Sequence, residues 1–537
     1  MTTASFSERP LYPYLLVAYF VLFVFSENLG SAYLVQVLRP LLVLLGLAAA
    51  GVAILSAVTR SINAGSALLA LFGVLLVAQP GIEQLAVSRL GMPRLALYLV
   101  EALAAVALGS ATVIGVKRWG SVNSALNLVA LLLLALTLAP IARFGFAAPD
   151  RLLRQPVARS VDDTPVLTTD RVSARPDVYY ILLDAYARAD VLRDYFGYDN
   201  SKFVGFLRNS GFTVADRSYA NYPLTGLVVN STLNMDYIAD ASGFTTLPDG
   251  TRVFPNMLIA DNRVGGAFAA LGYRLVTIQS VGRYTTTANA EVKSLRQRKW
   301  SPDEFEAALI NTTALPRLLD ALVRRLFSDR DRIDYALEEI VRQVSTPGPK
   351  LVVAHIMAPH QPFVYARDGS VPAIDPLRFG RLEHLPNDIR GYRDQIHYLN
   401  TQLTAIVTAI LRNSAPPPII ILQGDHGLRV TLNSLGTPGS ETPYINDSCP
   451  REVLANLSAV YLPDPAHRSG IPDDLSSVNT FRLVLDSYFD TGLGLLKEQS
   501  FFPRIQGSID NMSFTDITDK RASCSSSWEQ AMRNAQD

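Results

Sequence analysis

The chain has 537 residues, more than one ordinary domain needs, so at least two structural units are expected. Its 48 lysine and arginine residues balance 48 aspartate and glutamate residues, which excludes a protein that binds nucleic acid through a strong overall positive charge. Apolar residues are concentrated before about residue 143, and this distribution favours a membrane-embedded N-terminal part.

Five apolar stretches in that part are each about long enough to cross a bilayer as a helix. They cover residues 11–28, 33–56, 64–82, 95–116 and 121–142. The first stretch has no basic segment before it beyond Arg9, and no clear cleavage site follows it, so it is interpreted as a retained helix. We therefore expect a transmembrane domain over residues 1–142.

Basic residues in the short loops predict the orientation of these helices, because cytoplasmic loops carry an excess of lysine and arginine. With a cytoplasmic N-terminus, the inner side carries Arg9, Arg60, Lys117 and Arg118, and the outer loops carry Arg89 and Arg94. Five spans then place everything after the fifth helix outside the cytoplasm.

Two charged residues, Arg39 and Glu101, fall inside the apolar stretches. Charged residues at such positions are candidates to face a bundle interior or a lipid head group. The alternative for Arg39 is a side chain that extends its charged end to the membrane interface. For both residues, we prefer the interpretation that the charged side chain has no specific role.

Residues 143–176 show no clear periodicity and are interpreted as a juxtamembrane linker, with a short interfacial helix around Arg143–Arg154. A folded domain is expected over residues 177–537. The chain's two cysteines, Cys449 and Cys524, lie in this domain. Because an exported domain sits in an oxidising compartment, a disulfide between them is expected, with two free buried thiols as the alternative.

Strand and helix patterns alternate along the exported part, which predicts a mostly parallel central sheet covered by helices on both faces. The predicted strands are Val178–Leu183, Tyr273–Ile278, Lys350–Ile356, Ile419–Leu422 and Leu457–Leu462. The predicted helices cover residues 188–196, 199–209, 226–239, 302–326, 329–345 and 390–412. Residues 362–390 are interpreted as a surface insertion near the active edge.

Two predicted strands are followed directly by carboxylates. Asp184 follows the first strand, and Asp425 with His426 follows the strand that ends near Gly424. The carboxyl ends of strands are where ligands bind in open α/β sheets, so these side chains are candidate ligands of a divalent metal. The alternatives are a helix N-cap for Asp184 and a plain turn for Asp425-His426-Gly427.

A hydroxyl stands at the start of another predicted helix. The apolar spacing after Thr225 predicts a helix there, which makes Thr225 a candidate N-cap. A helix N-terminus also offers backbone N–H groups to a phosphate or sulfate, and a metal could activate this hydroxyl as a nucleophile. Ser231 and Thr232 are rival hydroxyls about two turns into the helix.

Two histidines follow the strand Leu351–Ala354. His355 lies at the strand end and is interpreted chiefly as a structural residue that orients the following loop. His360 lies in that loop and could bind an anionic substrate or protonate a leaving group, with a solvated loop residue as the alternative. The remaining histidines, His384, His397 and His467, are interpreted as surface or packing residues.

Two carboxylates, one imidazole and one hydroxyl from separate segments form a possible four-ligand set for Zn²⁺ or Mn²⁺. The set is Asp184, Thr225, Asp425 and His426. A metal held there would lower the pKa of the hydroxyl and neutralise a transferring phosphoryl group.

At these residues the chain resembles the alkaline phosphatase/sulfatase superfamily, and more narrowly the membrane-anchored phosphoethanolamine transferases and lipoteichoic-acid synthases. The motifs are Leu182-Leu183-Asp184, the Thr225 segment, the His355–Phe363 loop and Gln423–Gly427. The resemblance implies that Asp184, Asp425 and His426 are metal ligands and that Thr225 is both ligand and nucleophile. It also implies that His360 binds the substrate phosphate, and His355 is placed with it as a substrate-side residue.

The chain departs from relatives in this superfamily at three places. It has no Cys/Ser-x-Pro-x-Arg motif, so formylglycine-dependent sulfatase chemistry is not expected. Two-metal relatives place an Asp, with a His four residues on, where this chain reads His360-Gln361-Pro362-Phe363-Val364, so the second metal site is incomplete and one bound metal is expected. Asp184 stands where the nearest transferases often carry glutamate.

The resemblance implies a transferase that moves phosphoethanolamine or phosphoglycerol from a membrane phospholipid to an envelope glycan or glycolipid through a phosphothreonine intermediate. The expected location is the bacterial inner membrane, with a periplasmic catalytic domain and no nucleic-acid partner. Two alternatives remain: a phosphodiesterase, phosphatase or sulfatase that uses water, and a non-catalytic lipid-binding sensor with the same fold.

Overall fold

The computed structural model describes most of the chain. The described residues are 8–29, 32–115, 119–147, 175–238, 245–246, 252–253, 262–280, 290–294, 304–318, 329–372, 385–428, 449–505 and 512–536. The predictions for Lys117, Arg118, His384 and linker residues 148–174 lie outside these ranges.

The chain divides into two compact units. Unit 1 contains Met1–Pro156 and Trp300–Ser328, and unit 2 contains Val157–Lys299 and Asp329–Asp537. Residues 300–328 thus cluster with the N-terminal helices, although the sequence placed them in the exported domain. The predicted boundaries at residues 142 and 176 stay predictions.

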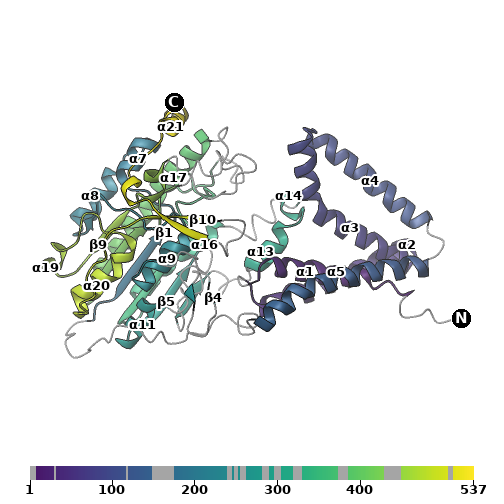
Figure 1. Ribbon diagram of the computed structural model, residues 1–537, viewed down its shortest axis with the longest axis horizontal. Helices are drawn as coiled ribbons and strands as arrows, with labels where there is room; N and C mark the ends of the chain where they lie inside the picture. Colours follow the sequence, from purple (N-terminus) through teal and green to yellow (C-terminus); the bar gives the residue numbers. More distant parts are fainter. Residues whose placement is uncertain are drawn as a thin grey trace. The chain divides into compact units, whose positions relative to one another are not determined.

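Unit 1 is entirely helical in its described residues (Figure 1). Its elements are α1 (Tyr12–Glu27), α2 (Leu34–Thr59), α3 (Ile62–Glu83), the π-helix η2 (Gln84–Arg89), α4 (Arg94–Gly115), α5 (Trp119–Ala147), α13 (Glu304–Asn311) and α14 (Leu315–Leu318). Four helices are long and apolar enough to cross a membrane, namely Leu34–Thr59, Ile62–Val87, Ala96–Val113 and Trp119–Phe146. The first predicted span corresponds to α1, an apolar helix of 16 residues.

An asparagine in α5 satisfies the backbone at the start of α1. Asn127 Oδ1 accepts hydrogen bonds from the N–H groups of Leu11 (3.0 Å) and Tyr12 (2.8 Å). Its Nδ2 donates to the Arg9 carbonyl at 2.7 Å. The first N–H groups of a helix have no intrahelical acceptor, and a membrane offers none, so Asn127 fixes α1 against α5.

Arg39 has a specific partner, contrary to the sequence interpretation that preferred no role. Its guanidinium donates from Nε and Nη2 to both carboxylate oxygens of Glu306 in α13. The two residues are 267 positions apart in the chain, so no local pattern could indicate the pair. The same interpretation of Glu101 stays a prediction.

Unit 2 is built on a seven-stranded mixed sheet with the strand order β2-β9-β8-β1-β7-β5-β6. Three of these strands, β1, β5 and β9, are labelled in Figure 1. The strands are β1 (Val178–Leu183), β2 (Thr213–Val214), β5 (Arg274–Gln279), β6 (Glu291–Ser294), β7 (Lys350–Ile356), β8 (Ile419–Gly424) and β9 (Ser458–Tyr461). Strands β8, β1, β7, β5 and β6 run parallel, whereas β9 pairs antiparallel with β8 and β2 pairs antiparallel with β9.

Helices cover both faces of this sheet, as the alternating pattern predicted. They are α7 (Ala189–Phe196), α8 (Ser201–Asn209), α9 (Thr225–Asn234), α11 (Arg263–Ala270), α16 (Asp329–Val344), α17 (Leu385–Asn413), α18 (Pro450–Leu454), α19 (Pro465–Arg468), α20 (Thr480–Phe489) and α21 (Ser526–Gln536). Short 3₁₀-helices cover Ser477–Asn479 (η5) and Thr518–Lys520 (η7), and two small hairpins pair β3 (Thr245–Thr246) with β4 (Arg252–Val253) and β10 (Phe501–Ile505) with β11 (Met512–Asp516).

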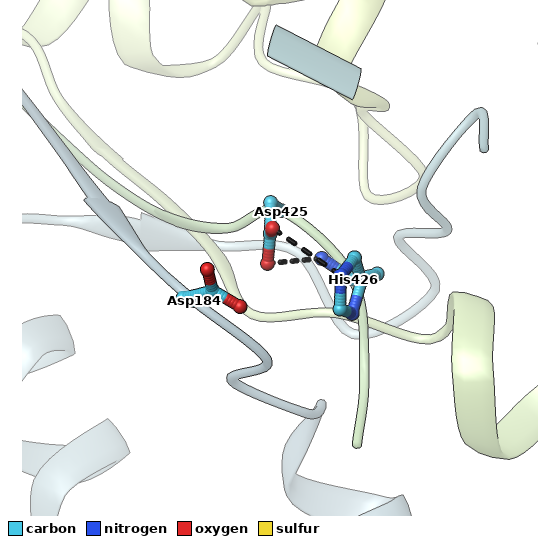
Figure 2. Close-up of side chains that lie close together, drawn as sticks. All are labelled: Asp184, Asp425 and His426. Carbon is cyan, nitrogen blue, oxygen red and sulfur yellow. Dashed lines mark hydrogen bonds and ion pairs between the residues drawn. The ribbon is translucent and has the colours of Figure 1, made fainter. Parts of the chain in front are cut away.

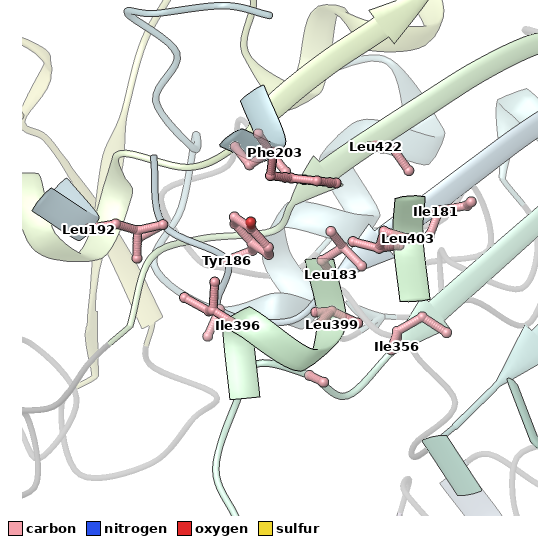
Figure 3. Close-up of a cluster of buried hydrophobic side chains, with 14 of the residues drawn as sticks. Ile181, Leu183, Tyr186, Leu192, Phe203, Ile356, Ile396, Leu399, Leu403 and Leu422 are labelled. Atoms are coloured by element: carbon pink, nitrogen blue, oxygen red, sulfur yellow. The ribbon is translucent and has the colours of Figure 1, made fainter. Parts of the chain in front are cut away.

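Alternate side chains of β1 enter two separate apolar cores, because successive residues of a strand point to opposite faces. Tyr179, Ile181 and Leu183 pack with α7, α8, α16, α17 and α21 on one face. Figure 3 shows Ile181 and Leu183 in this cluster. Tyr180 and Leu182 pack with α9, α11 and α20 on the other face. With both faces buried, the central strands hold a fixed register, which in turn fixes the residues that follow their ends.

The sequence missed three features of the chain after residue 176. It did not indicate that β9 runs antiparallel, because an apolar run does not reveal strand direction. The helix predicted over 302–326 contains two short helices, α13 and α14, in its described part, with Thr312–Ala314 between them. The C-terminal helices α20 and α21 were not predicted.

Cys449 and Cys524 form a disulfide that closes a loop with a sequence separation of 75. Cys449 directly precedes α18, and Cys524 lies shortly before α21, whose Trp528 and Met532 are buried in the core on the α17 side of the sheet. The disulfide therefore attaches the C-terminal segment to the part of the chain that follows the Asp425-His426 turn.

Candidate metal centre

The register of the three central strands brings the predicted site residues to one edge of the sheet. Leu183, the last residue of β1, is aligned with Ile356 of β7 and Gly424 of β8. Asp184 and Asp425 are therefore the next residues on adjacent parallel strands, as Figure 2 shows. Their backbones continue the pairing, since Asp425 N–H donates to the Leu183 carbonyl at 3.3 Å.

Asp184 is buried, and its two carboxylate oxygens have different surroundings. Oδ2 accepts a hydrogen bond from His355 Nε2 at 3.2 Å. Oδ1 is buried without a hydrogen-bond partner among the described residues. A buried carboxylate oxygen with no partner is costly unless a cation or proton occupies the position it faces.

Asp425 repeats this pattern. Its Oδ1 accepts from the N–H groups of Ala185 (2.8 Å) and His426 (2.7 Å). Its Oδ2 is buried and receives no hydrogen bond from the described part of the chain, and it lies 3.4 Å from His426 Nε2. Each carboxylate thus has one oxygen held by the protein and one oxygen left for a ligand.

The hydrogen bonds of His426 fix its tautomer. Nδ1 lies 2.7 Å from the Gly427 carbonyl, which can only accept, so Nδ1 carries the proton and donates it there. The lone pair of Nε2 therefore points toward the Asp425 carboxylate and the Thr225 hydroxyl. Metal-bound imidazoles in proteins typically donate their second nitrogen to a carbonyl in this way.

Asp184, Asp425 and His426 each offer one ligand atom, and these atoms lie within 4.8 Å of one another. Ligands around a four-coordinate zinc ion are separated by about 3.4 Å at bond lengths near 2.1 Å. This spacing fits a divalent metal ion if the three ligand atoms move closer together by about an ångström. The two carboxylate oxygens without partners among the described residues fit the same ion. Two buried carboxylates side by side would otherwise repel each other.

Thr225 completes the group. It is the first residue of α9, and the N-cap position falls on Leu224 instead of Thr225, one residue earlier than the sequence indicated. Its hydroxyl lies 3.3 Å from His426 Nε2 and donates to that unprotonated nitrogen. The threonine as a whole is half-buried. The rivals Ser231 and Thr232 are buried and donate to the Val228 carbonyl within the helix.

The segment before Thr225 is held rigidly. The Asn221 side chain donates to Ser476 Oγ and the Gln499 carbonyl and accepts from Val478 N–H. The Tyr222 ring packs against Phe501 of the β10–β11 hairpin, with ring centroids 5.8 Å apart. These contacts fix the position of the Thr225 hydroxyl before any substrate binds.

His355 is 1% exposed, and its Nε2 donates to Asp184, a contact that can orient this candidate ligand. The substrate-side role of His355 stays a prediction. His360 is half-buried; its backbone N–H donates to the Asp184 carbonyl at 2.9 Å, and its Nδ1 donates to the Gln361 carbonyl. The assignment of His360 to an anionic substrate stays a prediction.

Electrostatics keep Asp184 ionised. Burial raises the pKa of its carboxyl, but attraction by His360 and the hydrogen bond from His355 lower that pKa well below its usual range. The group at the end of β1 is therefore a carboxylate at neutral pH, as a metal ligand must be.

Glycines allow the two ends of the Asp425-His426 turn to approach other backbone. A Cβ on Gly424 would lie 2.3 Å from the Tyr186 carbonyl oxygen, and one on Gly427 would lie 1.9 Å from the Glu452 carbonyl oxygen. Both distances are far shorter than a carbon–oxygen contact allows, so larger residues at either position would displace the turn.

The sequence did not reveal a tyrosine that supports the site. Ala185, next to Asp184, has φ +62°, a conformation that L-residues rarely adopt. Its N–H donates to Asp425, and its carbonyl accepts a 2.6 Å hydrogen bond from the buried hydroxyl of Tyr392 in α17. The same hydroxyl accepts from Ala187 N–H at 3.1 Å. Tyr392 thus holds the strained turn that joins the two aspartates.

Tyr392→Phe is expected to weaken zinc binding by roughly 10- to 100-fold, since supporting residues of metal ligands commonly have effects of that size. Loss of the hydroxyl leaves two backbone groups of the turn without their partner. Competition with a chromophoric chelator measures the affinity. Tyr365→Phe is the matched control, because that buried hydroxyl donates to Asp334 instead. Equal zinc affinity in the two variants would contradict the supporting role of Tyr392.

Comparisons with known proteins find a likeness in solved structures. No protein-family model matches the chain, and no curated protein matches it. The C-terminal periplasmic domain of EcEptC from Escherichia coli, in complex with Zn, is 12% identical, with 68% of this chain and 96% of that chain covered and a TM-score of 0.41. The corresponding domain of the phosphoethanolamine transferase EptC from Campylobacter jejuni is 13% identical, with 62% and 98% covered and a TM-score of 0.37.

Hydrolases are among the similar structures as well. The phosphonate monoester hydrolase of Agrobacterium radiobacter is 14% identical, with 62% of this chain and 81% of that chain covered and a TM-score of 0.38. The function proposed below is argued from the geometry of the site.

Proposed function

We propose that this protein is a membrane-bound, metal-dependent transferase that moves a phosphoryl-linked head group, phosphoethanolamine or phosphoglycerol, from a phospholipid to a glycan or lipid acceptor. One observation carries the proposal. The hydroxyl of the half-buried Thr225 lies 3.3 Å from His426 Nε2, beside two buried carboxylates that each have one oxygen without a hydrogen-bond partner among the described residues. The same chain contains helices able to cross a membrane.

The residues proposed to hold the metal are Asp184, Thr225, Asp425 and His426, and one ion, Zn²⁺ or Mn²⁺, is proposed. A bound divalent cation would supply a lowered pKa for the coordinated hydroxyl and charge neutralisation for the phosphate. The protein supplies the remaining features: a fixed nucleophile, ionised ligands and a histidine tautomer with its lone pair directed inward.

The proposed reaction has two displacements at phosphorus. In the first, Thr225 Oγ1 forms a bond to the head-group phosphorus, the bond from phosphorus to the diacylglycerol oxygen breaks, and that oxygen takes up a proton while the threonine proton is lost. In the second, an acceptor hydroxyl attacks the phosphothreonine, loses its proton, and Thr225 regains one. Covalent catalysis of this type divides one difficult transfer into two easier steps.

His360 is assigned to the phosphate oxygens in both steps. Its support is that the imidazole is half-buried and that the backbone N–H of His360 donates to the Asp184 carbonyl, which places the residue beside the ligand group. The backbone N–H groups in the first turn of α9 are assigned to the same phosphate oxygens, because a helix N-terminus favours an anion.

Two alternative functions were considered. A hydrolase would share the first displacement and use water in the second, so only product analysis separates it from a transferase. A lipid-binding sensor would not need two buried carboxylates, each with one oxygen that has no partner among the described residues, next to the Thr225 hydroxyl. That pair of oxygens favours a catalytic site.

The proposed location is a bacterial inner membrane, with a cytoplasmic N-terminus and unit 2 in the periplasm. Support comes from the loop charges described above and from the disulfide of unit 2, which needs an oxidising compartment to persist. The proposed partners are a membrane phospholipid as donor and an envelope glycan or glycolipid as acceptor.

The experiment uses the purified full-length chain in detergent micelles with Zn²⁺ or Mn²⁺ and either phosphatidylethanolamine or phosphatidylglycerol. Diacylglycerol is expected from one of the two donors, together with head group linked to protein. Added glycan acceptor should then collect the head group. Release of free head group at the same rate with and without acceptor would favour the hydrolase, and the absence of diacylglycerol from both donors would refute the proposal.

A further inference from the structure

One segment of unit 1 lies in the sequence between the two ranges that make up unit 2. Strand β6 ends at Ser294 and helix α16 begins at Asp329, and between them residues 300–328 join the membrane-embedded helices. The chain therefore passes between the two units three times, near residues 156, 299 and 328. The described part of this excursion, residues 304–318, is called the docking segment here.

The docking segment has an apolar face that packs on α1 and α2. The ring of Phe305 meets that of Phe25 edge-on, with centroids 6.1 Å apart and an interplanar angle of 88°. Leu309 is buried in the same cluster, which also contains Val21, Val24 and Val37. The docking segment is also held between α13 and α14, where Ala314 N–H donates to the Leu76 carbonyl of α3 at 2.8 Å.

A charge pair adds specificity to this packing. Arg39 is the only residue of α2 with a charged side chain, and it donates two hydrogen bonds to Glu306. The Glu306 side chain is 11% exposed and that of Arg39 is 37% exposed, so the carboxylate would be left in apolar surroundings without its partner. An isolated charge in such surroundings is expensive, and a two-pronged pair with arginine fixes both position and orientation.

We propose that residues 304–318 form a docking segment that binds the surface of α1 and α2 through the Arg39–Glu306 pair, and so attaches the α/β domain to the membrane unit a second time. Resting on the proposed function, this attachment serves turnover of a donor that lies in the membrane. It is not needed for a small phosphodiester in water.

The test measures docking without relying on activity. Hydrogen–deuterium exchange of the full-length protein in micelles is followed over the amides of α13. Glu306→Arg places two cations together and is expected to raise their exchange rates roughly tenfold or more, because local opening costs less once the pair is lost. Arg39→Glu should do the same, and the double variant Arg39→Glu/Glu306→Arg should restore slow exchange. Asn311→Arg, which adds the same charge at an exposed position of α13, is the control.

The outcomes separate the proposals. Fast exchange in both single variants, with slow exchange in the double variant and in the control, supports docking. Unchanged exchange in Glu306→Arg, or no restoration in the double variant, overturns it.

For the functional part, Glu306→Arg should reduce diacylglycerol release several-fold while hydrolysis of a soluble phosphodiester stays unchanged, and an equal loss of both would refute it. If the wild type shows neither activity, the transferase proposal fails, while the exchange data still decide docking.

Discussion

Thr225→Ala is expected to lower diacylglycerol release from the phospholipid donor by roughly a thousandfold or more, because the variant lacks the atom that attacks phosphorus. The head group should also no longer become linked to the protein. The effect should appear in kcat, since the missing interaction is made only as the reaction proceeds. Initial rates with labelled phospholipid, and peptide mapping for a phosphate-linked adduct, measure both results.

Two variants define the expected specificity of this loss. Thr225→Ser keeps a hydroxyl and should retain substantial activity and the adduct. Thr232→Ala removes a buried hydroxyl of the same helix, whose bond is to the Val228 carbonyl, and should leave the rate within a few-fold of wild type. Near-normal turnover by Thr225→Ala would remove this residue from the mechanism.

Asp425→Asn is expected to abolish tight metal binding, with a loss of more than about a hundredfold in zinc affinity, because the variant replaces a charged ligand by a neutral one. The metal-free protein should nevertheless melt at a higher temperature than the metal-free wild type. In the wild type Asp425 and Asp184 bury two negative charges together, and the substitution removes that repulsion while asparagine can still accept from Ala185 N–H.

The measurement compares thermal unfolding with and without added Zn²⁺, alongside metal content per chain. The wild type should gain stability in proportion to its zinc affinity, and Asp425→Asn should gain little. Asp334→Asn is the control, since that carboxylate is bonded to Tyr365 and lies outside the ligand group. A zinc-induced stabilisation of Asp425→Asn equal to that of the wild type would place the metal elsewhere.

Much of the ligand group could be predicted because parallel strands impose a simple rule. Asp184 and Asp425 each follow an apolar run, and adjacent parallel strands in register bring the residues after their ends together. Thr225 was recognised as the start of a helix, although the helix begins with it as the first residue instead of the N-cap. These features depend on local pattern and on one general property of sheets.

The remaining features depend on contacts between distant segments. Tyr392 is one of several buried tyrosines, and nothing in the pattern of α17 marks its hydroxyl as the group that holds Ala185. Arg39 has a partner 267 positions away, in a segment whose helical pattern resembled that of its neighbours in the α/β domain. The direction of β9 likewise follows from its connection and packing, and an apolar run is equally compatible with either direction.

The account depends most directly on a single ion that contacts four particular side chains. Anomalous X-ray diffraction from crystals of the full-length protein grown with Zn²⁺ measures this. We predict one strong zinc peak in unit 2, about 2.0–2.2 Å from an oxygen of Asp184, an oxygen of Asp425, His426 Nε2 and Thr225 Oγ1. Two results would contradict the account. One is zinc bound by Asp184, Asp425 and His426 with Thr225 Oγ1 outside bonding distance, and the other is zinc bound only elsewhere.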